Sequence, residues 1–76
     1  MKQVCYGTVG KENHHVTVFK RPSILSPMVT YLYPGDIVII DENESTDCYY
    51  KISSDNGAEG YCIQSAIERK DTGYGP

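Results

Sequence analysis

Histidine and cysteine are the side chains in this sequence that suit metal binding or nucleophilic catalysis. His14 and His15 are neighbours, and neighbouring residues of a strand point to opposite sides, so a single metal ion cannot bind both. Cys5, Cys48 and Cys62 lie far apart, without the CxxC or HxxxH spacing of zinc sites. The pattern therefore predicts no metal site and no cofactor, with both histidines in a solvated loop.

A catalytic cysteine would need a base beside it, an electropositive niche and a site for an oxyanion. Cys48 alone among the cysteines has a basic neighbour, Lys51. A chain of 76 residues also leaves little room for a shaped pocket that excludes water. We therefore expect a protein that is not an enzyme and has no catalytic residues.

Four acidic residues between Asp41 and Asp47 have the composition of a calcium loop. A calcium loop also needs a central glycine and a bidentate acid at its end, and this run contains no glycine. We expect the run to be a solvated hairpin tip, whose charge discourages pairing between sheet edges.

The aromatic side chains are seven tyrosines and one phenylalanine, without tryptophan. Most of them fall on candidate strands, where about half must point outward. Outward tyrosines beside a proline-containing loop would make a shallow groove for extended peptides or sugars. The alternative, that the rings only cover the ends of the core, stays open. The rings concerned are Phe19, Tyr31, Tyr33, Tyr49, Tyr50 and Tyr61.

Length and charge limit the classes of partner. A chain of 76 residues, 39% hydrophobic and 22% charged, makes one small globular domain. Its net charge of −3 argues against nucleic acid or membrane insertion, and no apolar run reaches the roughly 20 residues that cross a bilayer. Without a signal peptide, we expect a cytoplasmic or virion-associated protein, or a wall-associated one cut from a larger exported chain.

The stretch 31–41 gives the strongest signal for secondary structure. Pro34-Gly35 predicts a type II turn between two strands. Ile37 to Ile40 are four consecutive β-branched residues, which indicate a strand buried on both faces. The other strands must then wrap around it.

Short alternating runs separated by turn signals predict an all-β fold of five to six strands. Ile63 to Ala66 should form one 3₁₀ turn before Ile67 closes the core. The loop from Lys20 to Pro27 should fold over the core and bury Ile24 and Leu25. We expect one domain over 1–69 and a flexible tail over 70–76. The expected strands are Gln3–Val9, Val16–Phe19, Met28–Tyr33, Asp36–Asp41, Cys48–Ile52 and Ala58–Cys62.

The order of motifs over residues 16–67 resembles the bacterial SH3-like (SH3b) domain family. Val16-Thr17-Val18 precedes Arg21-Pro22-Ser23, and the family's "L-x-x-G-D-x-V-x-V" pattern fits the residues from Leu32 to Ile40. Tyr49-Tyr50-Lys51-Ile52 and Gly60-Tyr61-Cys62 stand where the family has "W-Y-K-V" and "G-W/Y-V". Tyr49 replaces the usual tryptophan. The resemblance implies a small SH3-like barrel of antiparallel strands.

The same resemblance implies a non-catalytic module that binds bacterial cell-wall peptidoglycan, often through its peptide portion. A groove would use the loop from Lys20 to Pro27 as one wall. Its ligand-binding residues would be Phe19, Tyr31, Tyr33, Tyr49 and Tyr61.

Two alternatives remain open at this point. The chain could instead be a structural adaptor of a phage tail, virion or other assembly, with its aromatic face against protein partners. A module that reads proline-rich ligands is less consistent, because the paired tryptophan of such modules is missing. The scattered cysteines suit buried apolar positions in a reducing compartment, although Cys5 and Cys62 could pair under oxidising conditions if the first and last strands adjoin.

Overall fold

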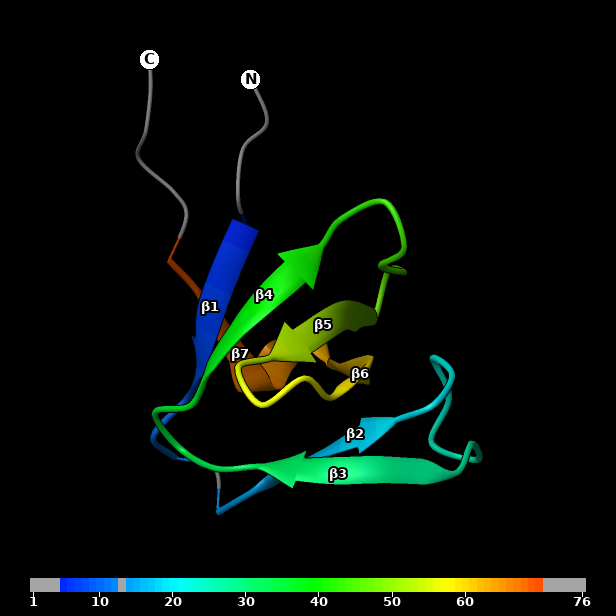
Figure 1. Cartoon of the computed structure of the whole chain (residues 1–76), viewed down its shortest axis with the longest axis horizontal. Coiled ribbons are helices and arrows are strands. Elements are labelled where there is room, and N and C mark those ends of the chain that lie inside the picture. The colour runs from blue at the N-terminus through cyan, green and yellow to red at the C-terminus, as the bar shows by residue number, and fades with distance from the viewer. Residues whose placement is uncertain (1–4, 13, 71–76) are drawn as a thin grey trace.

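The protein is a single antiparallel sheet of seven short strands, which a computed structural model describes for residues 5–12 and 14–70. Figure 1 shows the sheet bending so that the β2–β3 hairpin crosses beneath β4 and β5. The strands are β1 (Cys5–Val9), β2 (Val16–Phe19), β3 (Met28–Leu32), β4 (Ile37–Asp41), β5 (Tyr49–Ser54), β6 (Glu59–Ile63) and β7 (Ile67–Arg69). A 3₁₀ turn, η1 (Gln64–Ala66), separates β6 from β7.

The strand order across the sheet is β3-β2-β6-β5-β4-β1-β7. Consecutive strands β4, β5 and β6 form a meander, with Ile40 opposite Ile52 and Ile52 opposite Gly60. The other neighbours come from distant parts of the chain: β1 pairs with both β4 and β7, and β2 with β6. The expected all-β fold with one 3₁₀ turn is confirmed.

Every second residue of β2, β4 and β6 is buried in the core, and the other strands each add one or two buried residues. In β4 the side chains of Val38 and Ile40 are 1% and 4% exposed, whereas those of Ile37 and Ile39 are 56% and 47% exposed. The prediction that this strand is buried on both faces is therefore wrong, because the bent sheet covers one face of β4 and leaves the other in solvent. The buried apolar residues are Val9, Val16, Val18, Leu32, Val38, Ile40, Ile52, Cys62, Ala66 and Ile67.

The predicted turn at Pro34-Gly35 forms, as does a second tight turn at Asn56-Gly57, and each uses a glycine at positive φ. Gly35 has φ of 91° at the third position of the turn from Tyr33 to Asp36, which closes with a 3.0 Å hydrogen bond from Asp36 N to Tyr33 O. Gly57 has φ of 93° and donates its N–H to Ser54 O at 3.1 Å. Glycine is favoured at both positions because a Cβ is strained in this region.

At Gly60, β6 packs against β2 with no room for a side chain. A Cβ on this residue would lie 2.5 Å from the carbonyl oxygen of Phe19 and 2.6 Å from a methyl carbon of Val18. Glycine therefore lets β6 cross β2 and brings Tyr61 opposite Phe19.

Some element boundaries differ from those expected. A seventh strand, β7, adds to the predicted five to six because Ile67–Arg69 pairs with β1. The third strand ends at Leu32 rather than Tyr33, and the fifth runs on to Ser54. The expected strand residues before Cys5, and the expected tail beyond Lys70, lie outside the described residues.

The loop between β2 and β3 does not bury its apolar residues. It is closed by hydrogen bonds from Lys20 N to Pro27 O (2.9 Å) and from Arg21 N to Ser26 Oγ (2.8 Å). These bonds hold Ser26 inside the loop and place Ile24 and Leu25 in solvent, at 70% and 90% exposure. The prediction that both residues are buried is wrong.

No helix in the described part of the chain is both long and apolar enough to cross a membrane.

Candidate functional site

The outer faces of β2, β6 and β5 bring several aromatic side chains together. Phe19 lies opposite Tyr61, and Tyr61 lies opposite Lys51. One step along the same face, Ile63 lies opposite Tyr49. Residues that face each other across an antiparallel pair share one side of the sheet, so these five side chains form one continuous surface.

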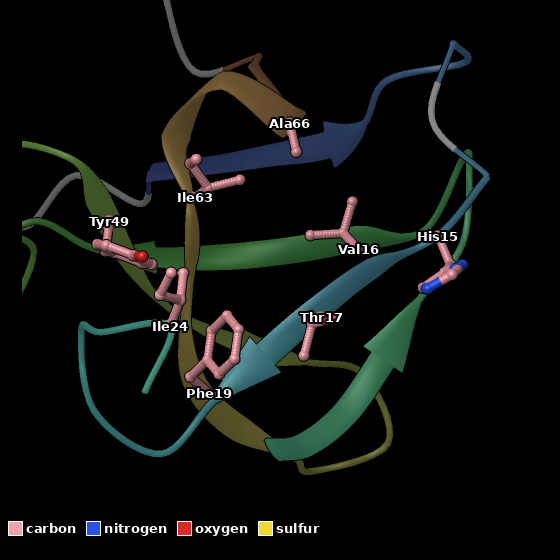
Figure 2. A pocket seen from close by; sticks show the side chains of 8 residues that line it. All are labelled: His15, Val16, Thr17, Phe19, Ile24, Tyr49, Ile63 and Ala66. Atoms are coloured by element: carbon pink, nitrogen blue, oxygen red, sulfur yellow. The ribbon is translucent and has the colours of Figure 1, made fainter. Parts of the chain in front are cut away.

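A pocket opens at one end of this surface. Its volume is about 220 Å³. Figure 2 shows Ile24 reaching from its loop towards the space between Phe19 and Tyr49. The rings of Phe19 and Tyr49 meet edge to face, with centroids 6.4 Å apart. The lining residues are His15, Val16, Thr17, Phe19, Ile24, Tyr49, Ile63 and Ala66.

The pocket is mainly apolar and small. Pockets that enclose whole drug-sized molecules begin at about 300 Å³, so this one suits a single side chain of a longer ligand. Ile24 and Ile63 are 70% and 46% exposed, so a ligand side chain seated here would remove apolar surface from water. Such burial contributes about 25 cal/mol per Å².

Two more hollows lie next to this pocket on the surface. The second shares Ile63 with the first and adds Asp47, Cys48, Tyr50, Gln64 and Ser65. The third shares Asp47, Tyr50 and Gln64 with the second and ends at Glu42 and Arg69. Together the three form a groove that starts apolar at Phe19 and becomes polar beside the β4–β5 loop.

Hydrogen bonds fix the polar end of this groove. Gln64 donates its backbone N–H to Cys48 O at 2.9 Å and its side-chain Nε2 to Thr46 O at 2.7 Å. The Arg69 guanidinium pairs with Glu42 at 2.5 Å and lies 6.0 Å from the centre of the Tyr50 ring. These contacts join η1 and β7 to the β4–β5 loop, so the groove floor is part of the folded core.

The residues expected at the site are divided between this groove and its surroundings. Phe19 and Tyr49 line the pocket, and Tyr61 lies next to Phe19 with the Lys51 ammonium 5.6 Å from its ring centre. Tyr31 instead stacks edge-on against His15 at 4.7 Å. Tyr33 lies at the Pro34-Gly35 turn, where its N–H donates to Asp36 Oδ2.

Sequence reasoning missed several lining residues. Ile63 could have been found, because it follows buried Cys62 in a strand and alternation must turn it outward. Val16 and Ala66 had no such signal, since both read as core residues and only the tertiary packing exposes their edges to the pocket. His15 was expected in a solvated loop; it is exposed, yet it lines the far end of the pocket.

The described residues hold no group of three or more His, Cys, Asp or Glu side chains placed to bind a metal ion. Cys62 is fully buried, and burial raises the pKa of its thiol from 9.0 to about 12. Cys48 is exposed. Cys5 is half-buried and packs against the core.

Comparison with known proteins agrees with this architecture. A family model described as "Bacterial SH3 domain" matches residues 14–68. None of the curated proteins compared with the chain matches it. Bacterial SH3 domains are typically binding modules, and an open groove in a small all-β fold is consistent with binding. Because the family model covers more than half of the sequence, the chain belongs to the bacterial SH3 domain family.

Proposed function

We propose that this chain is a non-catalytic module that binds the peptide portion of bacterial cell-wall peptidoglycan. The ligand lies in the groove that begins between Phe19 and Tyr49. Tyr61 extends the aromatic surface beside it, while Tyr31 and Tyr33 contribute at most to the outer margin. The observation that carries the proposal is the exposed apolar pocket on a face where the family resemblance implies a ligand.

The size and shape of the groove favour an extended peptide over a compact molecule. The apolar pocket accepts one side chain, and the adjoining polar hollows accept the next part of the chain. Alternate side chains of an extended peptide are about 7 Å apart, which suits neighbouring hollows that share a single residue, Ile63.

Co-sedimentation with purified bacterial walls tests the proposal. The wild-type chain should pellet with walls at physiological salt, and soluble stem peptides should release it. Failure to pellet, with the protein shown to be folded, would contradict the proposal.

Single substitutions then locate the groove. Tyr49→Ala should weaken wall binding by about tenfold or more, as truncation of a central aromatic contact commonly does. Tyr6→Ala is the matched control, since Tyr6 is an exposed tyrosine on β1 outside the groove. Equal affinities for wild type and a folded Tyr49→Ala variant would show that the groove is not the site.

A second candidate function is that of an assembly adaptor, favoured by an apolar face on β1 and β4. Tyr6 lies opposite Ile39 there, and Ile37 is adjacent; all three are exposed. Under this alternative Ile39→Lys would abolish a stable complex with a protein of the assembly. If the chain instead binds cell-wall peptide, the same substitution would leave wall binding intact.

A further inference from the structure

We propose that the polar end of the groove binds the free side-chain ammonium of a diamino residue in the wall peptide, through the Asp47 carboxylate. This inference rests on the proposed function and makes it more specific. The ligand would place an apolar group between Phe19 and Tyr49 and its ammonium beside Asp47.

Shared lining residues make these two places neighbours on the surface. Ile63 belongs to both the apolar pocket and the second hollow, and Asp47 belongs to both the second and third hollows. A peptide that crosses Ile63 therefore reaches Asp47 next. Over that step the occupant keeps apolar contacts with Ile63 and Tyr50 and gains the polar side chains of Asp47 and Gln64.

The charges at this end select a cation. Glu42 is already neutralised by Arg69. Within the described part of the chain, the Asp47 carboxylate makes no ion pair or hydrogen bond. It is thus the uncompensated charge of the second hollow, and it is negative.

Gln64 adds a second acceptor. Its Nε2 donates to Thr46 O, so the carbonyl oxygen Oε1 is the end of the amide left for a ligand. An ammonium group has three donors and no acceptor. It can therefore bond to Asp47 and Gln64 together, whereas a carboxylate or phosphate would be repelled.

The backbone on either side of Asp47 is held in place before any ligand arrives. Thr46 N donates to Tyr49 O at 2.8 Å, and Gln64 N donates to Cys48 O at 2.9 Å. These bonds fix the backbone on both sides of Asp47, so a ligand pays little ordering cost there.

Binding of two synthetic peptides to the full chain tests the inference. Both contain alanine, D-isoglutamine, lysine and D-alanine, acetylated at the N-terminus and amidated at the C-terminus. The lysine carries a free ε-ammonium in one peptide and an ε-acetyl group in the other. Wild type should bind the charged peptide about 1.5- to fivefold more tightly, the range expected for a solvent-exposed ion pair, and high salt should reduce the difference.

Asp47→Asn should lose this preference while still binding the acetylated peptide as wild type does. Glu44→Gln is the matched control: it removes the same charge from the same loop, at an exposed residue that lines none of the three hollows. It should keep the preference.

The outcomes separate the inference from the function on which it rests. Equal binding of both peptides by wild type, or an equal loss of preference in both variants, would overturn the Asp47 assignment and leave wall binding standing. If neither peptide binds and the protein does not pellet with walls, both proposals fall.

Discussion

Cys48 and Cys62 differ in access to solvent, the property that controls thiol reactivity. Cys48 is exposed, whereas Cys62 is fully buried with a pKa raised to about 12. Only a thiolate attacks an alkylating reagent. Native protein at pH 8 should therefore label at Cys48, and Cys62 should label only in denaturant, as mass spectrometry of peptides would show. Rapid native labelling of Cys62 would contradict the buried position of its thiol.

The same burial predicts a dependence of stability on pH. Below about pH 9, folded and unfolded chains both keep the Cys62 proton, so this thiol contributes no pH dependence. Between about pH 9 and 12 the unfolded chain releases the proton and the folded chain retains it, so the free energy of unfolding should fall as pH rises.

Urea titrations across this range would measure the effect. Cys62→Ala should be less stable than wild type at neutral pH, because it loses buried contacts. It should nevertheless decline less steeply with pH than wild type, since the titrating thiol is absent. If the free energy of unfolding fell equally steeply with pH in wild type and in Cys62→Ala, the raised pKa of the Cys62 thiol would be contradicted.

Buried and exposed side chains alternate along β4, and this alternation predicts how much each position contributes to stability. Ile40→Ala should lower the free energy of unfolding by about 2–5 kcal/mol, because Ile40 is buried in the core and truncation leaves a cavity. Ile39→Ala should cost less than about 1 kcal/mol, since that side chain is 47% exposed. Urea denaturation of the two variants would measure both values. Similar costs at the two positions would mean that β4 is covered on both faces.

At the scale of the whole molecule, the described core draws its first residue from Val9 and its last from Ile67. We therefore propose that the domain lies within residues 1–70, where Lys70 N still donates to Tyr6 O at 2.9 Å, and that 71–76 do not contribute to its stability. Deletion of 71–76 should leave the melting temperature unchanged within about 2 °C, because every residue of the described core remains. Deletion of 67–76 should prevent folding, because it removes Ile67 and the β7 partner of β1.

Scanning calorimetry of wild type and of the two deletion variants would measure these effects. A single transition is expected for a domain of this size. A large loss of stability in the shorter deletion would show that the domain extends beyond residue 70.

Much of the fold could be predicted because the signals are local. Alternation placed β1, β2 and β6, and glycines at Pro34-Gly35 and Asn56-Gly57 marked turns whose φ values few other residues adopt. The apolar run from Ile37 to Ile40 predicted a strand correctly and its burial wrongly. A run of β-branched residues favours extended backbone in either case, whereas coverage of the second face depends on how far the sheet bends.

The candidate site, like the fold, could be predicted from the sequence only where local signals decide the structure. Residue type and alternation indicated outward aromatic rings, and two of the five expected, Phe19 and Tyr49, line the pocket. The sequence by itself determined which residues are extended, where the chain turns and that the fold is all-β, because these properties depend on neighbours in the chain. Only the tertiary structure decided that β2 crosses β6 at Gly60 and that η1 lies against the β4–β5 loop. Those contacts join residues far apart in the sequence, and they bring Phe19, Ile63 and Asp47 into one groove.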